Sequence, residues 1–381
     1  MEELLSKNYI EYRQRIREFA TAEVLPIALE QDAKEEFPVN LAKKMGQAGL
    51  FGITIPKEYG GQGLDYLSYI IAVEELARVD SSPAATVAAH NSLGITPICS
   101  FGTEEQKQRY LHGLCTGDKI WAFGLTEENA GSDPKGVETR ADLIDGEWVI
   151  NGSKMFITNS ASDIASGITL QAITGYNGDK KEISAILIDR ETPGYHVAPI
   201  KGKLVWRAID NGKMRFENCR VPESCLLGNR GEGMRIMLST LDGGRLSIAA
   251  IGLGLAQGAF EMALSYSKKR KQFGKPIVEN QAISFKLAEI AVKIEAARSL
   301  LYNTCRLKDK GKPYGKEAAM SKLYCSEIAR EVADESLQIH GGYGLLHENH
   351  IERFYRDQRL LQIGEGTSEI LKLVISRHIL K

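Results

Sequence analysis

The hydrophobic pattern of this chain changes its period twice, and that change limits the possible folds more than any other feature. Apolar residues recur at helical spacing up to about residue 118, most clearly over residues 9–29, 41–50 and 66–78. Between residues 119 and 218 the period is two, and beyond Gly233 long helical patterns return. Because strands and helices occur in blocks, alternating β–α–β units are excluded and a multi-domain α+β protein is predicted.

The order of these blocks predicts three domains, which fits a chain of 381 residues, more than one ordinary core accommodates. We expect an N-terminal α-helical domain at residues 1–118, a middle β domain at 119–225 and a C-terminal helical domain at 226–381. The short strands of the middle part are typical of a small antiparallel β-barrel or sandwich. The long helices that follow, without a low-complexity linker, are typical of a helical bundle.

Turn and cap signals place some boundaries within these domains. Thr103, followed by two glutamates, is predicted to cap a helix that runs to about residue 114. Asp145-Gly146 and Asn151-Gly152 are hairpin signals, one on either side of a predicted strand at residues 147–150.

Composition and charge exclude several functional classes. The chain carries 48 Lys and Arg against 49 Asp and Glu, so no basic surplus indicates a nucleic-acid partner. The apolar runs are shorter than the roughly 18 residues of a spanning helix, and the acidic N-terminus lacks a secretory or transit pattern, so we expect no membrane insertion. Six scattered cysteines without a CxxC pair fit a reducing compartment. A bacterial cytoplasmic protein is expected, and the mitochondrial matrix is less favoured.

Two motifs look functional but are better explained by structure. Gly252, Gly254 and Gly258 nearly form a GxGxxG pattern, but one residue too many separates Gly254 from Gly258. The three glycines also lie inside a predicted helix, not between a strand and a helix. These glycines are therefore predicted to allow close helix packing. His347 and His350 could ligate a metal, yet no third ligand accompanies them, so solvated loop histidines and no metal are expected.

The strongest candidate for chemistry is Glu365, which lies between two glycines just before an apolar helical run. Thr367 or Ser368 can cap that helix, and Glu369 suits its positive first turn. A base at such a bend can meet a bulky substrate, and the free N–H groups nearby can hold an anionic oxygen. The alternative interpretation is a glutamate in an ordinary surface turn.

Four further stretches could bind a flat or phosphorylated ligand, although each also has an ordinary structural reading. Residues 123–133 combine small and hydroxyl residues, and residues 154–159 set an aromatic beside a hydroxyl; either fits a common turn and strand. The basic residues of 270–276 suit pyrophosphate, or form a solvated charge run. The glycines of 338–345 follow a helix and could simply end it.

Together these stretches resemble the acyl-CoA dehydrogenase family along essentially the whole chain. One family signature matches Gly-Leu-Thr-Glu-x-x-Ala-Gly-Ser-Asp-x-x-Gly at residues 124–136, and a second matches Gln-x-x-Gly-Gly-x-Gly-Leu-x-x-Glu at residues 338–348. Arg-x-x-Phe-Gly at 270–274 and Glu-Gly-Thr-x-Glu at 365–369 add to them. The resemblance implies an N-terminal helical domain, a middle antiparallel β-barrel and a C-terminal four-helix bundle.

The resemblance also implies FAD as the cofactor, an acyl-CoA substrate, an electron-transfer flavoprotein as electron partner, and a homotetramer built as a dimer of dimers. The catalytic base would be Glu365. FAD would be bound by Phe123, Leu125, Thr126, Gly131, Ser132, Phe156, Ile157, Thr158, Arg270, Phe273, Gln281, Gln338, Gly341, Gly342, Thr367 and Glu369. The acyl-CoA would contact Ser132, Asp242, Arg245 and Gly366.

Within the family the chain resembles the short- and medium-chain branch, which includes butyryl-CoA dehydrogenase. Other branches carry the base where this chain has Gly244, and residues 88–92 lack the arginine of glutaryl-CoA dehydrogenases. The reaction implied is removal of the α-proton by Glu365 while the β-hydrogen passes to the flavin. Val205 and Ile209 depart from the usual Gly and Ser, in a loop expected near the active site. The same site could run in reverse as an enoyl-CoA reductase, and a non-redox relative is the third alternative.

Overall fold

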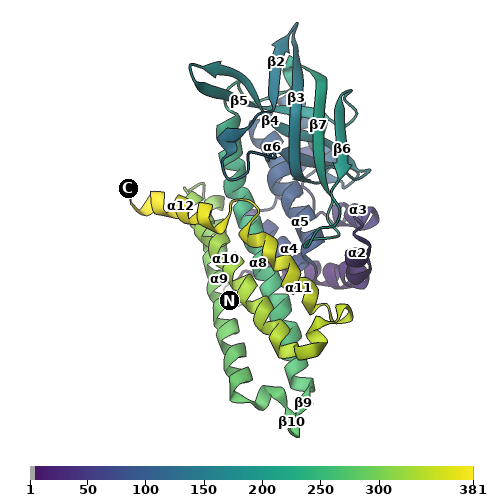
Figure 1. Ribbon diagram of the computed structural model, residues 1–381, viewed down its shortest axis with the longest axis vertical. Coiled ribbons are helices and arrows are strands. Elements are labelled where there is room, and N and C mark those ends of the chain that lie inside the picture. The colour runs from purple at the N-terminus through teal and green to yellow at the C-terminus, as the bar shows by residue number, and fades with distance from the viewer. Residues whose placement is uncertain (1–4, 381) are drawn as a thin grey trace.

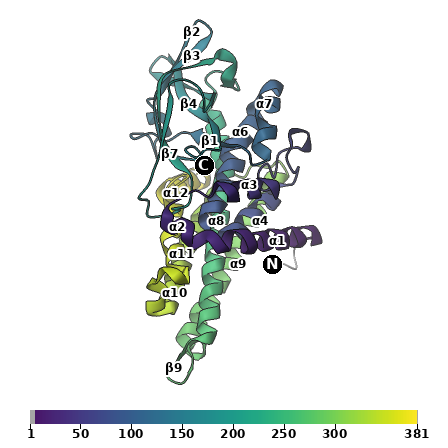
Figure 2. The same cartoon turned by 90° about the vertical axis from the view of Figure 1, so that its right-hand side faces the viewer.

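The computed structural model describes residues 5–380 and places a β domain at one end of the molecule and long helices at the other (Figure 1). The first helices cover one side of the long ones, and α1 runs across them (Figure 2). The N-terminal elements are α1 (Lys7–Phe19), α2 (Ala28–Lys34), α3 (Val39–Gln47), α4 (Tyr66–Ala77), α5 (Ser81–Ala89), α6 (Thr96–Phe101) and α7 (Glu104–Cys115).

Two details of the N-terminal helices follow from local sequence. The cap predicted at Thr103 is confirmed: its Oγ1 accepts a hydrogen bond from Gln106 N at 3.2 Å, and Gln106 Oε1 accepts one from Thr103 N at 3.1 Å. One π-helical turn, His90–Ile95, follows directly after α5. Such turns frequently mark functional sites.

The strands of the middle part form one eight-stranded sheet in the order β6-β7-β3-β2-β4-β5-β8, with β1 paired to β4. Most pairings are antiparallel, as predicted, but β1 and β2 each run parallel to β4. The path ends at β6 and β8, so this ladder does not close into a ring. The strands are β1 (Ile120–Gly124), β2 (Arg140–Ile144), β3 (Glu147–Thr158), β4 (Ala165–Asn177), β5 (Lys180–Asp189), β6 (Tyr195–Pro199), β7 (Asn211–Pro222) and β8 (Leu226–Leu227).

One of the two hairpin predictions is confirmed and the other is wrong. Asp145 and Gly146, with φ of 52° and 81°, make the two-residue turn between β2 and β3. Asn151-Gly152 makes no turn, because β3 continues through it to Thr158. The register against β7 shifts between Ile150 and Gly152, whose φ is 147°, so this glycine serves a β-bulge.

The last part of the chain is helical. The long helices α8, α9 and α10 pack side by side, and α11 contacts α8 and α10 to complete the predicted four-helix bundle (Figure 1). By length and composition α8 could cross a membrane, but it is mostly buried against other helices, like the core helix of a globular domain. The helices are α8 (Gly233–Lys269), α9 (Gln281–Asp309), α10 (Gly315–His340), α11 (Ile351–Asp357) and α12 (Ser368–Ile379), and β9 (Lys271–Gln272) pairs with β10 (Lys275–Pro276).

The glycines of α8 allow the close packing predicted from the sequence. A β-carbon added at Gly254 would lie 2.2 Å from Glu74 O, and one at Gly258 would lie 2.1 Å from Arg78 O, both at the end of α4. A β-carbon at Gly252 would lie 2.8 Å from Cys325 O of α10. The prediction of packing glycines, instead of a nucleotide loop, is therefore confirmed.

A buried ion network joins the first and third parts of the chain. Glu74 of α4 accepts a hydrogen bond from Arg298 Nε of α9 at 3.0 Å and another from the Tyr302 hydroxyl. Arg13 Nη2 of α1 lies 3.8 Å from the same carboxylate. These charges and hydrogen bonds lower the pKa of Glu74 despite its burial. The network holds α4 in place against the bundle.

Candidate active site

The turn that holds Glu365 has an unusual backbone. Glu365 and Gly366 have φ values of 53° and 93°, so a non-glycine residue adopts the left-handed conformation immediately before a glycine that favours it. Thr367 then caps α12, because its Oγ1 accepts a hydrogen bond from Ile370 N at 3.2 Å. Among the described residues the amide of Glu365 donates to no acceptor, so that N–H is free to hold an anionic oxygen.

The carboxylate of Glu365 is not a solvated surface group. Its Oε2 is buried and has no hydrogen-bond partner among the described residues. Burial raises the pKa of this carboxyl to about 7, and the positive charges of Lys322 and Arg245 oppose the rise. Tyr66 and Tyr69 of α4 lie close enough for the glutamate charge to raise their pKa values further, after burial has done so. A carboxyl with a pKa near 7 suits a general base at neutral pH.

Gly244 of α8 lies directly against this carboxylate. A β-carbon added at Gly244 would be 2.1 Å from Glu365 Oε2. The two positions that carry the base in different branches of the resembling family are therefore adjacent in space, although 121 positions separate them in the chain.

The predicted substrate residues surround the turn only in part. Arg245 is buried, and its Nη1 donates a hydrogen bond to Asp242 Oδ1 at 2.6 Å. Its positive charge also lowers the pKa of Glu365. The Nε atom of Arg245 is buried without a partner among the described residues. Gly366 is part of the turn itself. Ser132 is exposed on the loop after β1.

The predicted flavin residues of the β domain meet at one side of the sheet. Phe123 is buried in β1, Leu125 and Thr126 follow it half-buried, and Gly131 is exposed on the same loop. Thr126 O accepts a hydrogen bond from Met155 N at 2.9 Å, which joins this loop to the end of β3. That end of β3 carries Phe156, Ile157 and Thr158.

Phe156 is the most unusual residue of this group. Its φ is 60°, and 63% of it is exposed although it is an aromatic residue in a strand. Strained backbone and exposed apolar surface are both features of ligand sites. The loop beside it is fixed by Lys154, whose Nζ lies 2.7 Å from Glu127 Oε1 and 3.1 Å from Leu125 O. Burial lowers the pKa of Lys154 to about 8.

A second group of predicted residues gathers at the far end of the bundle. A cavity of about 570 Å³ lies between the end of α8 and the end of α10. Its lining includes Arg270, Gly341 and Gly342, and Arg270 lies over the ring of Tyr343 at 5.4 Å. No β-carbon contact within 4 Å would occur at either glycine, so a ligand can approach this backbone closely. A cationic guanidinium beside accessible backbone suits a phosphate group.

Three further predicted cofactor residues are exposed. Gln281 and Gln338 lie on the surface of α9 and α10, and Phe273 is 98% exposed in the turn between β9 and β10. Figure 1 shows this turn at the opposite end of the molecule from the β domain. Within one chain, the predicted cofactor residues therefore lie in two groups that are far apart. Thr367 and Glu369, at the start of α12, belong with the Glu365 group.

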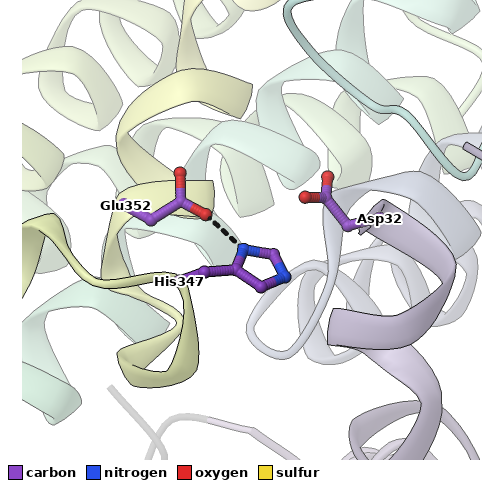
Figure 3. Close-up of side chains that lie close together, drawn as sticks. All are labelled: Asp32, His347 and Glu352. Atoms are coloured by element: carbon purple, nitrogen blue, oxygen red, sulfur yellow. Dashed lines mark hydrogen bonds and ion pairs between the residues drawn. The ribbon is translucent and has the colours of Figure 1, made fainter. Parts of the chain in front are cut away.

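His347 belongs to a charged cluster with Asp32 and Glu352 (Figure 3), and His350 is not part of it. Arg356 occupies this cluster: its Nη2 lies 2.6 Å from Asp32 Oδ2, and its Nε lies 2.7 Å from Glu352 Oε2. The guanidinium already neutralises the carboxylates, so the cluster is better explained as an ion network between α2 and α11 than as a metal site.

Lys322 is a functional candidate that the sequence motifs do not indicate, and the effect of Val205 and Ile209 on the pocket stays a prediction. Lys322 is completely buried on α10 beside the Glu365 turn, and a lysine on the otherwise small and apolar face of that helix was the signal. Ile209 is buried and Val205 half-buried in the main helical core, together with Leu246 of α8. Their apolar side chains thus add to the core.

Family models cover nearly the whole chain. The acyl-CoA dehydrogenase N-terminal domain matches residues 6–118, the middle domain residues 122–219 and the C-terminal domain residues 231–380. A curated relative, the short-chain specific acyl-CoA dehydrogenase of Clostridium acetobutylicum, is 45% identical over 369 residues, which is 97% of either chain.

Solved structures share the whole fold. Butyryl-CoA dehydrogenase from Megasphaera elsdenii has a TM-score of 0.95 at 38% identity and 99% coverage of both chains. A chain from a structure described as an electron transferring flavoprotein of Acidaminococcus fermentans has a TM-score of 0.96 at 42% identity and 100% coverage of both. An acyl-CoA dehydrogenase complexed with FAD from Bacillus anthracis has a TM-score of 0.93 at 35% identity, covering 99% of this chain and 68% of that one.

Proposed function

This chain belongs to the acyl-CoA dehydrogenase family, and from that premise we propose that it oxidises a short-chain acyl-CoA thioester to the α,β-unsaturated thioester, with Glu365 as the base. The observation that carries the proposal is the Glu365 carboxylate itself, buried without a partner in a strained turn. The name of the Clostridium relative and the butyryl-CoA dehydrogenase structure support a short straight acyl chain.

The residues fit FAD, which the similar Bacillus anthracis structure binds. Within one chain, the loop after β1 and the exposed Phe156 would hold the ring system. The cavity with Arg270, Gly341 and Gly342 would hold a pyrophosphate or nucleotide part. FAD, when bound, supplies the acceptor for the hydrogen and electron pair that leave the β-carbon. Because the two groups lie at opposite ends of the molecule, one cofactor would use the first group of one subunit and the second group of a neighbour.

That arrangement requires at least a dimer, and the family resemblance implies a homotetramer built as a dimer of dimers. The exposed apolar side chains at the cavity end support it, since Phe273 is 98% and Leu345 72% exposed. Exposed apolar surface of this kind becomes buried when it lies in a subunit interface. Sedimentation velocity of the holoenzyme tests the assembly, and a monomer with full FAD content would contradict it.

The protein's own part in the reaction is proton removal and charge stabilisation. Ionised Glu365 takes the α-proton of the thioester, and its free amide N–H can donate to the thioester oxygen as negative charge develops there. One such donor contributes roughly 3–4 kcal/mol to the transition state. With a pKa of about 7, the rate of the proton transfer should rise with pH up to about neutrality and then level off.

An electron-transfer flavoprotein is the proposed electron partner, and the Acidaminococcus structure named for such a protein supports it. The same residues would also serve the reverse reaction, reduction of an enoyl-CoA. The redox potential of the bound flavin with each substrate and product pair decides the physiological direction.

The decisive experiment mixes the holoenzyme anaerobically with a panel of CoA thioesters and follows flavin absorbance. Butyryl-CoA or a related short chain is expected to bleach the wild type. The Glu365→Gln variant should still bind FAD, but its rate of flavin bleaching should fall by several orders of magnitude, because an amide cannot accept the proton. Equal bleaching by Glu365→Gln would refute the assignment of the base.

A further inference from the structure

Lys322 is a lysine that the reaction described above does not use, although it lies next to the base. It is on α10 and is completely buried, which is rare for a lysine. Its Nζ donates a hydrogen bond to Gly366 O at 2.7 Å, the carbonyl of the residue that follows Glu365. This is the one hydrogen bond of the ammonium within the described residues. The sole hydrogen-bond partner of this buried charge is therefore a backbone carbonyl.

The bond belongs to a set that attaches the whole turn to one face of α10. Ser326, one helical turn beyond Lys322, donates from Oγ to Leu361 O at 3.0 Å. Its carbonyl accepts from Gln362 Nε2 at 2.8 Å. Glu327 accepts from Ser368 Oγ at 2.8 Å. The turn is thus fixed before and after Glu365, and the bond from Lys322 is the one adjacent to the base.

Four charged groups act on the pKa of Lys322. They are Glu365 of the turn, Arg245 of α8, Glu327 of α10 and Glu369 of α12. Burial lowers the pKa of Lys322 to about 8, and the carboxylates oppose that fall. Lys322 in turn lowers the pKa of Glu365 against the effect of burial, and it does so more strongly than Arg245.

We propose that Lys322 is the positioning residue of the catalytic turn: its ammonium fixes the carbonyl of Gly366, and its buried positive charge favours the ionised form of the Glu365 carboxylate. This inference rests on the proposed function, in which Glu365 is the base. It accounts for two features together, the left-handed conformation of Glu365 and a buried lysine with one backbone partner.

The test compares three variants of the holoenzyme. Lys322→Met removes the charge and the donor, and Lys322→Gln keeps a donor without charge. Lys316→Met is the control, since Lys316 lies in the first turn of the same helix and pairs with Glu317. The first readout is the pH midpoint of Glu365, followed by the infrared band of the protonated carboxyl, with Glu365→Gln as the blank. Both Lys322 variants should raise that midpoint by about one pH unit or more, and the control should not.

The second readout is the pH profile of flavin reduction by butyryl-CoA. Its rising limb should move to higher pH in the Lys322 variants, so that the rate falls about fivefold or more at pH 7 and recovers at pH 9. An unshifted Glu365 midpoint in folded Lys322→Met overturns the proposal, and so does an equal shift in Lys316→Met. If neither Lys322 variant folds, the lysine stabilises the bundle and the proposal falls. Because the infrared midpoint needs no turnover, it stays informative if no acyl-CoA reduces the wild type, the outcome that would refute the proposed function alone.

Discussion

The α-carbon of Gly244 leaves no room for a side chain beside Glu365, since a β-carbon there would lie 2.1 Å from Oε2 of the glutamate. The neighbour is the end of a flexible side chain, so Gly244→Ala should displace the carboxylate instead of the helix. A shift of about 1 Å in a reacting group can cost 100-fold. We expect flavin reduction to fall 10- to 100-fold while the melting temperature hardly changes. Rapid mixing and calorimetry measure the two quantities.

Gly113→Ala is the matched control for that substitution. Gly113 lies in α7, where an added β-carbon meets Lys119 Cδ at an ordinary 3.9 Å. Alanine is favoured over glycine in a helix by about 1 kcal/mol, so this variant should be slightly stabilised and fully active. A Gly244→Ala enzyme as active as Gly113→Ala would show that the carboxylate acts from another position.

The sequence predicts the elements of this fold better than the contacts of its site. The cap at Thr103 and the turn at Asp145-Gly146 are predicted correctly because capping and tight turns depend on residues a few positions apart. The hairpin prediction at Asn151-Gly152 is wrong because the same dipeptide serves a bulge when tertiary pairing holds the strand. Local rules cannot decide between these uses.

Long-range contacts explain what the sequence left open at the site. The turn around Glu365 and the family resemblance both indicate this residue, and the resemblance links Gly244 to the same site. Nothing in the sequence places Lys322 beside it, because that contact depends on how α10 packs. The small residues of α8 predict close packing without naming the partner, which is Glu74 O for Gly254. The two distant groups of cofactor residues likewise become visible only with the fold (Figure 1).

Because the pKa of Glu365 is raised, this residue lowers the free energy of unfolding at high pH. Folded protein keeps this proton up to about pH 7, whereas the unfolded chain releases it near the ordinary value of 4.5. The folded state therefore binds more protons between these values, and its stability falls as pH rises through that window. Glu365→Gln should remove the loss, and above pH 7 should be more stable than wild type by on the order of 1–3 kcal/mol.

Urea titrations at pH 5 and pH 8 measure this effect. The stability gain of Glu365→Gln over wild type should be larger at pH 8 than at pH 5. The control is Glu289→Gln on the exposed side of α9, which should show no such difference. Equal gains at both pH values would mean that Glu365 titrates normally in the folded protein.

Replacing Glu74 in the helical core should lower the free energy of unfolding more than replacing a surface carboxylate. Glu74→Leu leaves Arg298 buried without the carboxylate it now bonds at 3.0 Å. Removing one partner of a buried ion pair costs about 3–5 kcal/mol. Asp189→Asn is the comparison, since Asp189 pairs with Arg109 on the surface and should cost about 1 kcal/mol or less. Chemical denaturation that ranks the two variants equally would contradict the buried network.

Gly254→Ala should destabilise the protein although alanine favours helices. The added β-carbon would lie 2.2 Å from Glu74 O, a backbone atom that cannot rotate away. Overpacking of this kind costs about 1–3 kcal/mol, which exceeds the propensity gain of about 1 kcal/mol. Thermal unfolding beside Gly113→Ala gives the test, because the two substitutions are chemically identical and should change the melting temperature in opposite directions.

Arg270 offers a test of the second cofactor group that is independent of turnover. If the cavity holds a phosphate-bearing part of the cofactor, Arg270→Gln removes a charge-assisted hydrogen bond worth roughly 1.5–3 kcal/mol. FAD affinity should then fall about 10- to 100-fold, measured by flavin fluorescence on rebinding to the apoprotein. Riboflavin, which lacks phosphate, should bind the variant and the wild type equally weakly. Lys268→Gln, a nearby exposed cation at the end of α8, is the control for general charge. An equal loss of FAD affinity in both variants would place the phosphates elsewhere, since only a specific contact distinguishes the lining arginine from its neighbour.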